Sequence, residues 1–78
     1  MWNHRILCRD IAGCRFFAVH EVYYTDDGTP VSWTAVPVKL VSDSYAGLTA
    51  TLEQVLDATQ QHVLQEVGDK LVPYEAGD

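Results

Sequence analysis

Histidine, glutamate and arginine side chains on the first two predicted strands are the groups in this sequence best placed to do chemistry. If Arg9 pairs with Arg15 across the first chain break, His4 faces His20 on one face of the sheet. Two imidazoles at adjacent strand positions can share a transition metal ion, although a stable site needs three or four ligands. The competing interpretation, which we favour, is that both histidines form hydrogen bonds with neighbouring groups.

Glu21 lies in the middle of the second predicted strand and is the one candidate for a general base. It would need a partner and a pocket, and a cross-strand ion pair with Arg5 is the simpler expectation. The sequence holds no Gly-rich phosphate loop, no GxSxG, no HExxH and no CxxC. We therefore assign no catalytic, cofactor-binding or metal-ligating residue, expect no cofactor, and predict that the protein is not an enzyme.

Three segments rich in aromatic and β-branched residues must position these side chains, and each predicts a strand. The predicted strands are residues 2–9, 15–25 and 30–41. A break at 10–14 separates the first two, and the run Thr25-Asp26-Asp27-Gly28 predicts a hairpin between the second and third.

A helix is predicted from residue 45 to about 61, because Ser44 is a good N-cap and apolar residues follow at helical spacing. The sequence thus predicts an α+β fold, a three-stranded antiparallel β-meander packed on one C-terminal α-helix. It is a single domain of residues 1–68, since the chain has only 78 residues, followed by a flexible tail at 69–78. Whether residues 62–78 are helical, packed or disordered stays open.

Both faces of the predicted sheet carry large apolar groups, whereas a single helix covers only one of them. We expect the helix to cover the face of Val19, Tyr23 and Trp33. Large exposed apolar patches mark interfaces, so we expect a homodimer or an unidentified protein partner. The residues proposed for this interaction surface are Phe16, Tyr24, Trp33 and Val38. If the tail folds back over the second face instead, this argument loses its basis.

Charge and composition exclude several other classes of protein. Five basic residues stand against eleven acidic ones, for a net charge of −6, so Arg5, Arg9 and Arg15 form only a weak basic patch and nucleic-acid binding is disfavoured. No segment approaches the roughly 20 apolar residues of a membrane span. Two cysteines and an N-terminus without a signal-like apolar run predict a cytoplasmic protein.

The run His20–Gly28, read HEVYYTDDG, with the following strand Ser32-Trp33-Thr34, resembles a group of short bacterial proteins of unknown function. That resemblance implies a bacterial source and β-β-β-α order but no activity. A weaker similarity in strand-then-helix order is to HicB-type antitoxins, whose Pro-Gly-Cys signature is missing here.

The leading hypothesis from the sequence is a protein-interaction or self-associating module. Two alternatives remain open at this point. The first is a small-ligand or metal-binding protein that uses His4, His20 and Glu21. The second is an antitoxin-like or nucleic-acid accessory protein.

Overall fold

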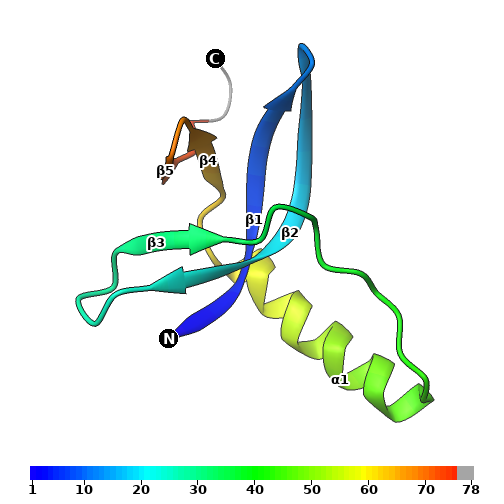
Figure 1. Cartoon of the computed structure of the whole chain (residues 1–78). Helices are drawn as coiled ribbons and strands as arrows, with labels where there is room; N and C mark the ends of the chain where they lie inside the picture. Colours follow the sequence, from blue (N-terminus) through cyan, green and yellow to red (C-terminus); the bar gives the residue numbers. More distant parts are fainter. Residues whose placement is uncertain (76–78) are drawn as a thin grey trace.

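Five β-strands form one mixed sheet, and one α-helix lies beside it in a computed structural model that describes residues 1–75 (Figure 1). Residues 76–78, the end of the predicted tail, lie outside the described residues. The elements follow one another in the order β1 (Trp2–Ile11), β2 (Cys14–Tyr24), β3 (Pro30–Trp33), α1 (Tyr45–Leu56), the short 3₁₀ helix η1 (Asp57–Gln60), β4 (Leu64–Val67) and β5 (Lys70–Pro73).

The strand order across the sheet is β3-β2-β1-β4-β5. Neighbouring strands are antiparallel except for β1 and β4, which are parallel. Parallel neighbours need a long crossover connection, and here the segment from β3 through α1 and η1 supplies part of it. The prediction of a three-stranded meander on a C-terminal helix is therefore wrong.

The predicted and observed folds differ because two short strands follow the helix. β4 pairs with β1 through Leu7 and Leu64, and β5 then folds back on β4 as an antiparallel hairpin. The sequence of β4 also fits the end of a helical stripe, so pairing with a distant strand decided its conformation. Part of the predicted tail thus belongs to the sheet.

The first hairpin turns more tightly than the sequence analysis assumed. Ala12 and Gly13 have φ of 52° and 82° and form a two-residue turn, so Asp10 pairs with Arg15. The assumed register, with Arg9 opposite Arg15, is wrong by one residue. A shift of one residue moves each side chain to the other face relative to its partner.

The second hairpin differs from the prediction in a similar way. A bulge at Tyr23 and Tyr24 places Trp33 opposite Val22 rather than Glu21. Regular pairing ends at Trp33, so the predicted strand at 30–41 is only four residues long. The chain then loops outward over residues 35–37, between a bond from Thr34 N to Glu21 O and one from Val38 N to Val19 O.

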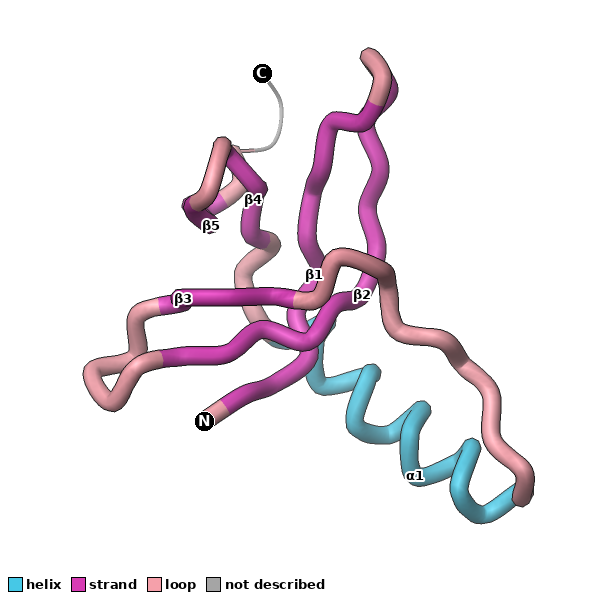
Figure 2. The backbone as a smooth tube through the Cα atoms, in the orientation of Figure 1, coloured by secondary structure: helices cyan, strands magenta, loops and turns pink. Residues whose placement is uncertain are grey.

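The sheet curls into a half-barrel, as the crossing directions of β1 and β3 in Figure 2 show. Trp33 on β3 donates its indole N–H to Glu66 on β4 at 2.5 Å, although β2 and β1 lie between these strands. In a flat sheet three strand spacings separate such residues by about 14 Å. The core lies on this concave face, where Leu7, Val22 and Leu64 form its buried centre.

Helix α1 begins where the sequence predicts, because Ser44 Oγ accepts a hydrogen bond from Gly47 N at 3.0 Å. It lies beside the convex face, on the side of His4. That face also carries Val19 and Tyr23, but the bulge has moved Trp33 to the concave face, which corrects the predicted trio. None of the helix residues is buried; Ala58 in η1 is the buried contact. No helix within residues 1–75 is long and apolar enough to cross a membrane.

Candidate functional site

A belt of polar side chains crosses the concave face and joins the outer strands. Glu66 accepts from Arg9 Nε at 3.2 Å and from Trp33 Nε1 at 2.5 Å. Arg9 also donates to the backbone oxygen of Ala35 at 2.8 Å, which ties the 35–37 loop to the sheet. The belt therefore links β3, β1, β4 and that loop, and it fixes the shape of the concave face.

His20 is the one buried polar residue among the described residues, with 1% of its surface exposed. Its Nδ1 lies 2.9 Å from the backbone oxygen of Thr34, so this nitrogen carries the proton and donates. Burial lowers the pKa of His20, and the nearby Arg9 acts in the same direction. A neutral imidazole thus holds the start of the 35–37 loop against the sheet.

An apolar groove of about 440 Å³ opens beside this histidine. Leu7 and His20 are buried among its lining residues. Six exposed apolar residues from the first hairpin and the loop surround it, and we call them the groove surface: Ile11, Phe16, Phe17, Ala35, Val36 and Pro37. Ile11, Phe16 and Val36 are 48%, 52% and 62% exposed, which is high for side chains of this kind. The volume and lining are those of a binding groove rather than a filled core.

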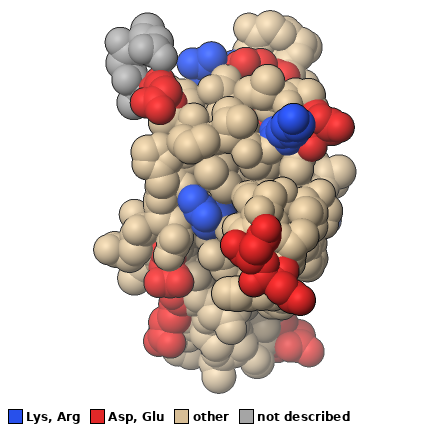
Figure 3. All heavy atoms as spheres, turned by 90° about the vertical axis from the view of Figure 1, so that its left-hand side faces the viewer, with Lys and Arg blue, Asp and Glu red and all other residues tan. Residues whose placement is uncertain are grey.

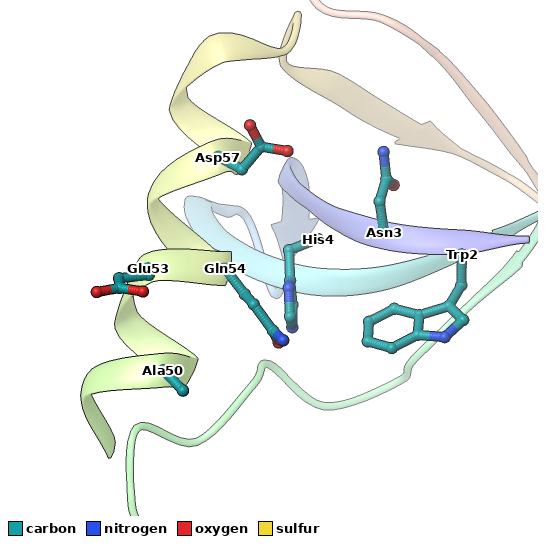
Figure 4. A pocket seen from close by; sticks show the side chains of 7 residues that line it. All are labelled: Trp2, Asn3, His4, Ala50, Glu53, Gln54 and Asp57. Carbon is teal, nitrogen blue, oxygen red and sulfur yellow. The ribbon is translucent and has the colours of Figure 1, made fainter. Parts of the chain in front are cut away.

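A second hollow, of about 550 Å³, lies between the start of β1 and helix α1 (Figure 4). Trp2 and His4 line it from the strand, with the two rings edge to face at 5.3 Å. From the helix, Gln54 points toward His4, whereas Glu53 points away from the hollow (Figure 4). With one side open and polar groups that do not converge on one point, this hollow is a weaker candidate than the groove.

The corrected register separates the polar residues that the sequence analysis had grouped. His4 pairs with Glu21, while His20 pairs with Arg5, so the two histidines lie on opposite faces. Glu21 accepts from Tyr23 Oη at 2.6 Å, and the predicted ion pair with Arg5 does not form. Across the described residues no three His, Cys, Asp or Glu side chains come together to hold a metal ion.

Arg5, Arg9 and Arg15 each have at least one hydrogen-bond partner within the chain, although Arg5 Nε is buried without one. Arg9 pairs with Glu66, and Arg15 pairs with Asp10 at 3.1 Å. Arg5 donates to Tyr24 Oη at 3.1 Å and to a backbone oxygen near the end of the crossover. In Figure 3 the basic side chains stand apart from one another, with acidic and uncharged atoms between them. This arrangement lacks the continuous basic surface that phosphate backbones require.

Of the proposed interaction residues, Phe16 lies on the groove surface and is half exposed. Tyr24 and Trp33 instead pack against the core from its edge, because the sheet curls over them. Val38 is half-buried, and its backbone N–H bonds to Val19 O at 2.9 Å.

Glu66 and the 35–37 loop were not foreseen from the sequence. The one local signal for the strand of Glu66 is Gly68-Asp69 between apolar pairs, which is a hairpin pattern. Comparison with known proteins brings no family model, no curated protein and no solved structure that matches this chain.

Proposed function

We propose that this chain is a non-enzymatic protein-interaction module whose binding site is the groove surface. The observation that carries the proposal is the gathering of six exposed apolar residues around one apolar groove. Apolar groups concentrated in this way mark sites of protein contact, because water contact costs free energy that a partner removes. The alternative of a metal site required His4 and His20 to lie on one face of the sheet, whereas they lie on opposite faces.

The overall surface of the chain supports the same conclusion. Its solvent-accessible area is 5560 Å², whereas a folded monomer of 8.7 kDa has about 4,700 Å². Its radius of gyration is 13.3 Å, against about 11.5 Å for a domain of this length. Only six of the described residues are buried. The chain is thus more open than a self-sufficient domain of its size.

The groove is suited to a short apolar segment rather than to a catalytic reaction. Its polar groups are His20 and Arg9, and both already have partners within the chain. A catalytic group needs a free hydrogen-bonding site directed at the substrate. An apolar side chain, by contrast, gains from the groove without breaking those bonds.

The test is selection of short random peptides against chains immobilised so sparsely that they cannot meet one another. Phe16→Thr removes the aromatic ring but keeps a β-branched strand former, and Tyr45→Thr is the matched control at an exposed site on α1. We expect apolar peptides that bind the natural chain and the control, and that bind Phe16→Thr about tenfold more weakly. Selected peptides that bind all three proteins equally would overturn the proposal.

A further inference from the structure

We infer that the partner of the groove surface is a second copy of this chain, held in a twofold-symmetric dimer. This inference rests on the proposed function and names the partner for the same surface. It follows from the amount of surplus surface, from the charge of the patch and from its shape.

The surplus area of the whole chain is as large as the area that a dimer interface buries on one partner. The chain exposes about 800 Å² more than a folded monomer of its mass, and a standard protein–protein interface buries about 800 Å² on each partner. Small chains with few buried residues commonly obtain their missing stability by self-association. Such stabilisation requires a partner that is always present with the chain. A second copy of the chain meets this requirement, because it is made at the same time and in the same amount.

The groove surface is electrically neutral in a chain whose net charge is −6. Arg9, which lines the groove, pairs with Glu66, and Arg15, next to Phe16 in the chain, pairs with Asp10. A strongly basic partner would therefore find no unpaired carboxylate there. Two copies of the same neutral patch, on the other hand, meet without bringing like charges into contact.

The patch combines an apolar hairpin end with the groove that this end helps to line. The β1–β2 hairpin projects at its tip (Figure 1), and Ile11 and Phe16 are about half exposed on its groove side. The other side of this end is in contact with the chain after β5, because Phe17 and Arg15 lie against the ring of Tyr74. The groove opens beside this projecting end and on the same face. A twofold axis next to the groove places the apolar end of each copy in the groove of the other, as an isologous interface requires.

The test combines light scattering with the alkylation rate of Cys14. Cys14 is exposed and pairs with Ile11 at the hairpin end, whereas Cys8 is buried, so a small thiol reagent reports on the hairpin end. We expect a mass that rises from monomer to dimer as the chain concentration increases from about 0.1 µM to 100 µM, a range suited to interfaces of this size. The alkylation rate of Cys14 should fall over the same range.

Variants locate the interface. Phe16→Thr and the loop variant Val36→Ser should each weaken the dimer about tenfold or more, with an unchanged circular dichroism spectrum, while Tyr45→Thr dimerises like the natural chain. A chain that stays monomeric at every concentration overturns the inference; if peptides still bind the groove, the proposed function stands. A dimer that leaves Cys14 equally reactive and is unaffected by Phe16→Thr overturns the inference, and the proposed function is overturned as well if Phe16→Thr also leaves peptide binding unchanged.

Discussion

The carboxylate of Glu66 joins the two sides of the half-barrel, so its neutralisation should loosen the whole fold. Glu66→Gln keeps the size of the side chain but removes the negative charge to which Arg9 and Trp33 both donate hydrogen bonds. Hydrogen bonds to charged groups contribute about 1.5–3 kcal/mol when shielded from water, and exposed ion pairs less than about 1 kcal/mol. The Arg9 and Glu66 side chains are 21% and 24% exposed, which places the expected loss at about 1–2 kcal/mol.

For a domain of this length such a loss lowers the melting temperature by about 5–15 °C. Thermal unfolding at one fixed chain concentration, followed by circular dichroism, measures it. Asp10→Asn is the matched control, because the Arg15–Asp10 pair is 48% and 55% exposed and should contribute under about 0.5 kcal/mol. If Glu66→Gln lowers the melting temperature no more than Asp10→Asn does, the belt does not hold the half-barrel closed. If the double variant loses as much unfolding free energy as Glu66→Gln and Arg9→Met lose in sum, the two side chains are not coupled.

Three further outcomes follow from the same structure. Ala12→Asn should raise the free energy of unfolding by about 0.5–1 kcal/mol in a urea titration, because asparagine tolerates the positive φ of this turn position better than alanine. The pKa of His20 lies below its ordinary value of 6.5 because of burial, so the unfolded chain takes up the proton at higher pH than the folded chain. Stability should therefore fall as the pH drops below about 6.5, and His20→Gln should flatten that fall in urea titrations over a pH series. The dimer should tighten as salt rises, because salt screens the repulsion between two chains of net charge −6; nucleic-acid binding would weaken instead, which sedimentation over a salt series distinguishes.

Local signals in the sequence predicted the local structure well. The N-cap at Ser44 is confirmed, as is the start of the helix, because one hydroxyl and the following apolar spacing determine both. The turn at Gly28 is confirmed too, with a φ of 88° that glycine adopts freely. These features depend on residues within a few positions of one another.

Features set by distant pairing were not predictable in the same way. The strand at Leu64 exists because Leu7 lies beside it, and nothing within the segment excludes a continued helix. The register of the first hairpin depends on whether its turn holds two residues or five. The length of the turn therefore decides whether His4 pairs with His20 or with Glu21. The grouping of His4, His20 and Glu21 therefore failed through geometry, although the residues themselves lie in strands as predicted.

The second face of the sheet is not left uncovered as expected, because the predicted tail folds back over it: residues 70–73 form β5, and Leu71 packs on the core. Curling lets β3 and β5 cover one end of the concave face, where Trp33 and Leu71 pack on the core. At the other end, the 35–37 loop lies across the groove from the end of the first hairpin, and Thr34 just before it holds His20. Exposed apolar side chains occur on several elements, and those that line the groove are the group around Phe16. Closure of the half-barrel and association through the groove can therefore be tested separately. Phe16→Thr should weaken the dimer but leave the hydrogen bonds of Glu66 intact. Glu66→Gln should weaken both the half-barrel and the dimer, because the 35–37 loop that lines the groove is held by Arg9, the partner of Glu66.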